Sequence, residues 1–347
     1  MKPHVLYIGY RIDERRREAV TINASLYRDA SQEAGFRCDF LAYRGSLISI
    51  WRLLAYLREV ASRVKQEPGL IVHDFFVLTG FSLVCVIYLR LRRLRVRYVK
   101  TFINLPGGVN YTSTIGWLRL FLNNRVIYRL LARLADTVTY IEPMDYPRFV
   151  RLPVPLRYAP GTVSPHQGPL RVSYLGHPIR LKGVRLLPHI VRAVQGARPK
   201  RVTFHFSFSG HWKFPRSLDS FDHDPVCTVE GEMEPDIIFG EADVYLLPIR
   251  DGFAASGSFN TIWEAMSCGC CVVTVRANHL PSLLTDDTAE LVTSPTAQQY
   301  ARAIIRLIDE PQRLATKQGN ALAAYRQHYD DCRGELNKVL GQLYEQV

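Results

Sequence analysis

A basic loop in the second half of the chain has the composition of a phosphate-binding site. In the segment YLGHPIRLKGVRLL, an apolar strand ends at Gly176 and a helix begins near Gly183. The first turn of a helix presents unpaired N–H groups and a partial positive charge, and both attract phosphate. The loop in between adds three basic side chains, namely His177, Arg180 and Lys182. A solvated basic loop would explain the same motif without a ligand.

A second segment combines a small-residue loop with an apolar helix that carries one carboxylate. In SGSFNTIWEAMSCG (256–269), Gly257 and Ser258 let the backbone approach a ligand closely, and the helix that follows offers its N-terminus to a phosphate. Glu264 lies four residues after Asn260 and therefore on the same helix face. Its carboxylate can accept two hydroxyl groups, as ribose recognition requires. A solvent-facing Glu264 is the alternative, but its immediate neighbours are apolar nearly all round.

Together the two segments resemble the retaining glycosyltransferases of the GT-B fold, in particular glycosyltransferase family four (glycosyl transferases group one). The order ADVYLLP, glycine-containing loop, N-x-x-x-EAM-x-CG and valine strand is similar to a motif of that family, and GHPIRLKG looks like its KG element. The resemblance implies an α/β fold of two Rossmann-like domains facing each other across a cleft. It covers the whole chain in architecture, with sharp motifs only from Gly176 to Thr274.

The resemblance also implies a role for each matching residue. Lys182, with Arg180 as a second cation, would contact the donor diphosphate, and Glu264 would hold the nucleotide ribose. The first Glu of the family's E-x7-E motif falls at Ser256. The transferred sugar would then be held by backbone amides, by Asp251, or poorly. The donor-binding residues implied in this way are Gly176, His177, Lys182, Ser256, Gly257, Ser258, Phe259, Asn260 and Glu264.

The first half of the chain offers fewer matches to the family. The position expected for its catalytic histidine, after KTFI, is Asn104, and His73 at the end of GLIVHD is a substitute candidate. A histidine at a strand end is more often structural. Gly9, Gly107 and Gly108 are candidates for the acceptor side of the cleft. The candidate catalytic residues are therefore Lys182, Arg180, His73 and Asn104.

The elements around these residues alternate between strand and helix, which predicts mainly parallel sheets with helices on both faces. Strands are expected at 4–10, 38–43, 69–75, 96–104, 170–176, 202–210, 242–248 and 271–275. Three separate helices are expected over 296–311, 312–329 and 332–347. The Pro-, Gly- and Ser-rich stretch 153–169 predicts an interdomain linker. We expect an N-terminal acceptor domain (1–160), a C-terminal donor domain (161–325) and a terminal helix (326–347) that packs back on the N-terminal domain.

Positive charge is concentrated in the first half of the chain. Residues 1–165 hold 25 Lys and Arg against 12 Asp and Glu, and no acidic residue occurs between Asp74 and Asp136. The basic amphipathic segment 117–135 and the run LRLRRLRVR suit an anionic membrane surface. An ordinary basic surface over the core is the alternative, and no recognition motif supports nucleic acid. The residues expected to face the membrane are Arg90, Arg92, Arg93, Arg125, Arg129 and Arg133.

Several other features narrow the function class. No run of 18 apolar residues and no signal peptide is present, so we expect a cytoplasmic protein, peripheral on the inner face of the plasma membrane. The seven cysteines lack zinc-ligand spacing and suit a reducing compartment. Asp222-His223-Asp224 matches a D-x-D metal motif but lies in a polar loop. We therefore expect no metal and no cofactor.

The sequence thus predicts a retaining transferase that moves a sugar from a nucleotide-sugar donor to a lipid-linked or glycan acceptor. Such chemistry serves polysaccharide, lipopolysaccharide or glycolipid assembly at the cytoplasmic membrane face. A GT-B epimerase or phosphorylase, which would share the fold and the phosphate site, is one alternative. A non-catalytic nucleotide-sugar-binding homologue is another, motivated by Ser256 and Asn104.

Overall fold

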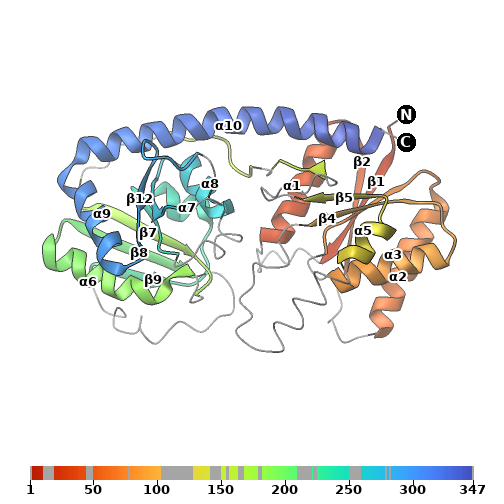
Figure 1. The fold of residues 1–347 in the computed structure, drawn as a ribbon, viewed down its shortest axis with the longest axis horizontal. Coiled ribbons are helices and arrows are strands. Elements are labelled where there is room, and N and C mark those ends of the chain that lie inside the picture. The colour runs from red at the N-terminus through yellow and green to blue at the C-terminus, as the bar shows by residue number, and fades with distance from the viewer. Residues whose placement is uncertain are drawn as a thin grey trace. The chain divides into compact units, whose positions relative to one another are not determined.

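The computed structural model divides the chain into two compact units (Figure 1). Unit 1 comprises Met1–Pro155 and Cys332–Val347, and unit 2 comprises Leu156–Asp331. The structure describes residues 2–10, 19–43, 50–76, 79–102, 128–140, 150–153, 156–162, 168–178, 182–208, 221, 225–249, 259–277, 280 and 283–345. None of the helices in these ranges is both long and apolar enough to cross a membrane.

Unit 1 is built on a parallel six-stranded sheet with the strand order β2-β1-β3-β4-β5-β6. Its strands are β1 (His4–Tyr10), β2 (Arg37–Tyr43), β3 (Ile71–Asp74), β4 (Arg97–Phe102), β5 (Thr137–Tyr140) and β6 (Val150–Arg151). Its helices are α1 (Ala19–Glu33), α2 (Ile50–Gln66), α3 (Thr79–Leu91) and α5 (Tyr128–Leu134). Parallel strands require crossover connections, and α1, α2, α3 and α5 lie in the connections between successive strands from β1 to β5.

Two apolar layers enclose the sheet of unit 1. Helices α2, α3 and α5 pack on one face, where Leu57, Val86 and Leu131 are buried against the strands. Helix α1 and the end of α10 (Pro311–Glu345) pack on the other face, where Tyr27 and Leu340 are buried. Residues 332–345 of α10 therefore complete the core of unit 1, although the helix begins in unit 2.

Unit 2 repeats the architecture with the strand order β12-β11-β10-β7-β8-β9, again all parallel. Its strands are β7 (Leu170–Gly176), β8 (Val202–Phe208), β9 (Cys227–Glu230), β10 (Val244–Leu247), β11 (Cys271–Val275) and β12 (Ala289–Val292). Its helices are α6 (Leu187–Ala197), α7 (Pro235–Gly240), α8 (Phe259–Ser267), α9 (Ala297–Asp309) and the first part of α10. The central strands β10 and β11 are buried along their whole length, as expected for a parallel sheet covered on both faces.

The alternation of strands and helices is confirmed, with two corrections. All eight expected strands are present, and four further strands were not expected, namely β5, β6, β9 and β12. The two helices expected beyond residue 311 are one continuous helix, α10. Its buried residues Tyr325, Cys332 and Leu336 keep helical spacing across the expected break, so packing overrides the weak helix propensity of Gly334.

Candidate functional site

Lys182 lies at the carboxyl end of the unit 2 sheet, just before the 3-10 turn Val184–Leu186 that leads into α6. The side chain is 5% exposed and folds back over the end of β7. A Cβ atom built on Gly176 would lie 3.1 Å from Tyr174 Oη and 3.5 Å from Lys182 Nζ, so the lysine side chain lies directly against the glycine backbone. Glycine at position 176 thus lets Lys182 and the Tyr174 hydroxyl lie close to the end of β7.

The Lys182 ammonium group has no anionic partner among the residues that the structure describes. No hydrogen bond or ion pair reaches it there, and burial lowers its pKa from 10.5 to about 8. A pKa depressed this far corresponds to roughly 3 kcal/mol of unfavourable free energy for holding the charge in the folded protein. A bound anion would offset this cost, because an opposite charge favours the protonated form.

The backbone beside Lys182 is fixed by Gly183. This residue has φ 70°, in the left-handed region, and a Cβ atom there would lie 1.7 Å from the carbonyl oxygen of Pro248. Pro248 follows β10, so the contact joins the turn after β7 to the end of β10. Glycine is therefore required by both the backbone conformation and the close approach.

We expect Gly183→Ala to lower the free energy of unfolding by at least about 2 kcal/mol. Alanine disfavours the left-handed conformation, and its Cβ atom would clash with the Pro248 carbonyl oxygen. Gly196→Ala is the matched control, since a Cβ atom at Gly196 in α6 has no neighbour within 4 Å. Alanine there should be neutral or stabilise the helix by up to about 1 kcal/mol. Denaturant unfolding of both variants checks this, and equal stability of the two would contradict the packing described.

Two buried tyrosines form hydrogen bonds at the carboxyl end of the unit 2 sheet, close to Lys182. Tyr174 Oη donates a hydrogen bond of 3.1 Å to the carbonyl oxygen of His177, which fixes the start of the loop after β7. Tyr245 Oη donates to the Leu175 carbonyl and hydrogen-bonds Thr261 Oγ1 of α8. These contacts hold the ends of β7 and β10 and the first turns of α8 together.

Glu264 lies in α8, and its side chain points into the protein interior and not into solvent. The residue is 6% exposed, and its neighbours Ile262, Ala265 and Met266 are fully buried. Burial raises the pKa of Glu264 from 4.5 to about 7, Arg157 lowers it, and Asp236 of α7 raises it. The solvent-facing alternative is therefore wrong. A half-protonated carboxyl group near neutral pH is a common feature of binding and catalytic sites.

Arg157 faces Glu264 and was not among the residues expected from the sequence. Its Nη1 atom lies 4.0 Å from Glu264 Oε1 and its Nη2 atom lies 3.4 Å from Glu234 Oε2. Nη1 is buried and has no hydrogen-bond partner in the described part of the chain. Arg157 is the only arginine or lysine in the predicted linker, which was the one sequence signal available.

His73, the histidine candidate of the first half, lies in a buried polar network of unit 1. Its Nδ1 atom is hydrogen-bonded to the Tyr344 hydroxyl and its Nε2 atom to Thr101 Oγ1. The residue is fully buried, and this burial, with nearby Lys100, holds its pKa well below the usual value. Both ring nitrogens are occupied within the core, so this geometry favours a structural role over the catalytic one considered from the sequence.

The other candidates are placed as follows. Gly9 is buried in β1, where a Cβ atom would make ordinary contacts with Phe40 and Phe75. Arg90 is paired with Asp136 at 2.7 Å, so its charge is neutralised, whereas Arg92, Arg93, Arg129 and Arg133 are exposed. The expected residues that lie outside the described ranges are Arg180, Asn104, Gly107, Gly108, Asp251, Ser256, Gly257, Ser258, Arg125, Asp222, His223 and Asp224. Phe259 and Asn260 begin α8.

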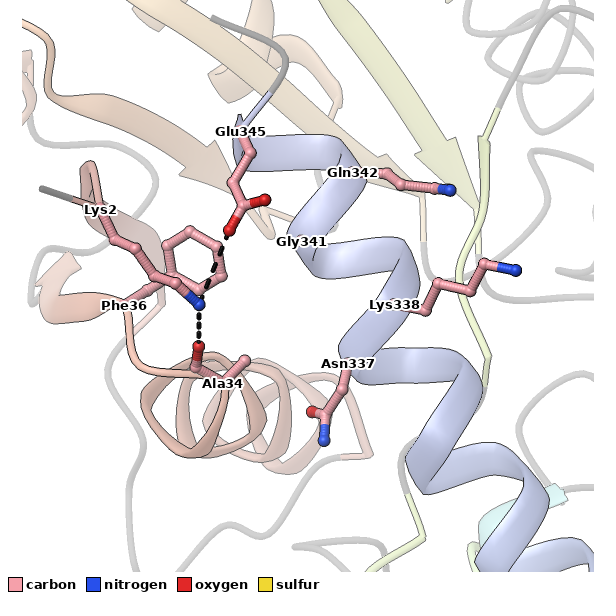
Figure 2. A pocket seen from close by; sticks show the side chains of 8 residues that line it. All are labelled: Lys2, Ala34, Phe36, Asn337, Lys338, Gly341, Gln342 and Glu345. Atoms are coloured by element: carbon pink, nitrogen blue, oxygen red, sulfur yellow. Dashed lines mark hydrogen bonds and ion pairs between the residues drawn. The ribbon is translucent and has the colours of Figure 1, made fainter.

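A hollow of about 540 Å³ in unit 1 is a different kind of feature (Figure 2). It lies between α1 and the end of α10, where Lys2 Nζ donates to the Ala34 carbonyl at 2.6 Å. The same atom lies 3.6 Å from Glu345 Oε1 and over the Phe36 ring. Lys2 in this hollow is therefore already paired, unlike Lys182, and we assign no ligand to the hollow.

Comparison with known proteins agrees with the geometry. Residues 169–310 match the family model described as glycosyl transferases group 1. No curated protein sequence matches the chain. The chain is similar in structure to Anabaena HepE in complex with UDP-glucose, with a TM-score of 0.72 and 15% identity over 99% of this chain and 100% of HepE.

Two further solved structures have the same fold. A glycosyltransferase from Rickettsia africae has a TM-score of 0.69 and 10% identity, with 100% of both chains covered. TarM of S. aureus, in a complex containing UDP, has a TM-score of 0.65 and 12% identity over 83% of this chain and 59% of TarM. The GT-B fold expected from the sequence is confirmed.

Proposed function

We propose that the protein is a retaining glycosyltransferase, because residues 169–310 match the family model of the glycosyl transferases group 1 and the chain has the GT-B fold. It moves a sugar from a nucleotide-sugar donor to a lipid-linked or glycan acceptor at the inner membrane face. The observation that carries this proposal is Lys182, a buried ammonium group with no anionic partner among the described residues. The donor diphosphate supplies the missing charge.

Unit 2 supplies the donor-binding groups in this proposal. Lys182 binds the diphosphate, and Glu264 accepts hydrogen bonds from the two ribose hydroxyl groups. A uridine nucleotide is the favoured donor class, because HepE was solved with UDP-glucose and TarM with UDP. The Glu264 carboxylate lies among apolar side chains, where a hydrogen bond to a charged group is stronger than in water.

The reaction follows from these positions. The bond between the sugar C1 atom and the β-phosphate oxygen breaks, a bond from C1 to the acceptor hydroxyl oxygen forms, and the hydroxyl proton leaves with the nucleoside diphosphate. Negative charge grows on the departing diphosphate, where the buried ammonium group of Lys182 stabilises it. We propose that Lys182, Arg180 and the N-terminus of α8 do this without a metal ion.

The proposal is tested by a thermal-shift panel of UDP-, GDP- and ADP-sugars, followed by product analysis with the donor that binds. A rise in melting temperature with UDP-sugars and release of UDP in the presence of a lipid-linked acceptor are expected. Epimerised donor without an acceptor would identify an epimerase instead. Binding without consumption of any donor would identify a binding protein.

Donor affinity should depend on pH in a bell-shaped manner. Below about pH 7 Glu264 becomes protonated and loses one ribose acceptor, and above about pH 8 Lys182 loses its proton. The cation of Arg157 favours the ionised form of Glu264, whereas Asp236 opposes it. Arg157→Gln should therefore move the acid limb of the profile to higher pH and leave the alkaline limb in place.

Calorimetric titration of UDP across both limbs measures this effect. Glu264→Gln serves as the control, because an amide has no proton to gain and its acid limb should disappear. An acid limb that stays at the same pH in Arg157→Gln would exclude Arg157 as the group that keeps Glu264 ionised.

A further inference from the structure

We propose that the outer face of α3, together with α5, inserts into an anionic lipid bilayer and docks unit 1 on the membrane. The purpose of this surface rests on the proposed function, because a lipid-linked acceptor must be reached at a bilayer. Its evidence is independent of the donor site, since all the residues involved belong to unit 1. We call the exposed side chains Val84, Ile87 and Leu91 the α3 stripe.

The α3 stripe is apolar where a surface helix normally carries polar residues. Val84, Ile87 and Leu91 are 43%, 38% and 77% exposed, and their spacing places them on one side of the helix. The opposite side packs into the core through Cys85, Val86 and Leu89. A helix that is apolar on both sides is normally buried on both sides. The core of unit 1 buries only one of these two sides, and the α3 stripe stays exposed.

Helix α5 extends the apolar surface. It packs beside α3, and its residue Leu130 is 39% exposed. The end of α3 is tied to the end of α5 by Arg90, which donates hydrogen bonds to the Leu134 carbonyl and to the Asp136 carboxylate. These bonds hold α5 beside α3, so we include the exposed Leu130 in the proposed docking surface.

Positive charge surrounds this surface. Arg92, Arg93 and Arg95 follow the stripe, and Arg129 and Arg133 flank Leu130; all five are exposed. No acidic residue occurs from residue 75 to residue 135, and Asp136 is already paired with Arg90. Apolar side chains with a cationic rim match a bilayer that has an apolar interior and anionic headgroups.

The charges also argue against a second copy of this chain as the occupant. A two-fold contact through the same surface would bring both sets of arginines together. Like charges brought close without counter-charges oppose association. An anionic bilayer supplies the counter-charges over a wide, adaptable surface, which is why we choose it over a self-contact.

Vesicle co-sedimentation tests the proposal. Wild-type protein should bind phosphatidylcholine vesicles that contain phosphatidylglycerol and not vesicles of phosphatidylcholine alone. The triple variant Val84→Ser, Ile87→Ser, Leu91→Ser should bind at least tenfold more weakly. Its matched control is Ile237→Ser in unit 2, where the side chain is 50% exposed on α7, and this variant should bind as the wild type does.

Arginine substitutions measure the contribution of the positive charges separately from that of the apolar stripe. Arg92→Gln with Arg95→Gln should reduce binding about 25-fold at low salt, since each arginine near an anionic surface contributes about fivefold. The exposed pair Arg192→Gln and Arg302→Gln in unit 2 is the control and should have no effect.

The proposal is overturned if the stripe variant sediments like the wild type, or if neutral vesicles bind equally well. Loss of a dimer in light scattering with unchanged vesicle binding would instead assign the stripe to a self-contact, which also overturns it. UDP affinity, measured on the same samples, reports on unit 2 and distinguishes failure of this proposal from failure of the proposed function.

Discussion

Replacement of Lys182 by methionine is expected to lower the rate of sugar transfer by about 100- to 1000-fold, the usual cost of removing one group that stabilises transition-state charge. Methionine fills the space of the aliphatic part of lysine and removes the charge. In the structure this charge is buried and has no counter-ion among the described residues. Release of UDP from a UDP-sugar in the presence of acceptor measures the effect.

The same substitution should not destabilise the protein. The folded state lowers the pKa of Lys182 to about 8, so below that pH it holds an ammonium group that the unfolded chain would solvate better. Lys182→Met removes this cost, and the melting temperature at pH 7 should rise or stay constant. Lys65→Met, at an exposed position of α2, is the control and should change neither property. Full activity of Lys182→Met would show that Lys182 does not stabilise the departing diphosphate.

The second large effect concerns Glu264. Glu264→Gln keeps the size of the side chain but loses the negative charge and one acceptor, so UDP binding is expected to weaken by about 10- to 100-fold. Arg157 retains Glu234 as an ionic partner, which limits the damage to the fold. Calorimetric titration with UDP measures the loss.

Glu241→Gln is the matched control for this substitution, because Glu241 is an exposed carboxylate of the same unit. It should bind UDP like the wild type. Equal affinity in Glu264→Gln would mean that another group holds the ribose, and the role assigned to α8 would have to be given up.

Much of the fold is predictable from the sequence because parallel strands buried on both faces are short continuous apolar runs. VYLL and CVVTV show this in unit 2, and both were expected. The strands that escaped notice, such as CTVE in β9 and AELV in β12, are four residues long and carry polar side chains. Their strand conformation depends on pairing with β8 and β11, which a local pattern does not reveal.

The candidate site residues could be selected from the sequence where their signal is local. Lys182 beside Gly183, and Glu264 among apolar neighbours, are visible within a few residues of sequence. Arg157 was missed because it meets Glu264 only through tertiary structure, more than 100 residues away along the chain. The catalytic candidacy of His73 came from its position at a strand end, which does not show that both of its ring nitrogens are bonded in the core.

The surface that we propose to face the membrane was also only partly predictable from the sequence. Composition indicated a basic half of the chain, but Arg90 belongs to a pair with Asp136 and does not offer a free charge. The α3 stripe could not be recognised from sequence, because an apolar helix is expected to be buried. Only the exposure of Leu91 and its neighbours in the folded unit reveals it.

The most direct test of the central claim is to follow a UDP-sugar by NMR in the presence of a lipid-linked acceptor, with wild-type protein and with Lys182→Met. The wild type should release UDP and form a glycoside that keeps the anomeric configuration of the donor, and Lys182→Met should leave the donor intact on the same timescale. Turnover by both proteins, an inverted product, or a donor that is epimerised and not transferred would contradict a retaining glycosyltransferase that works through Lys182.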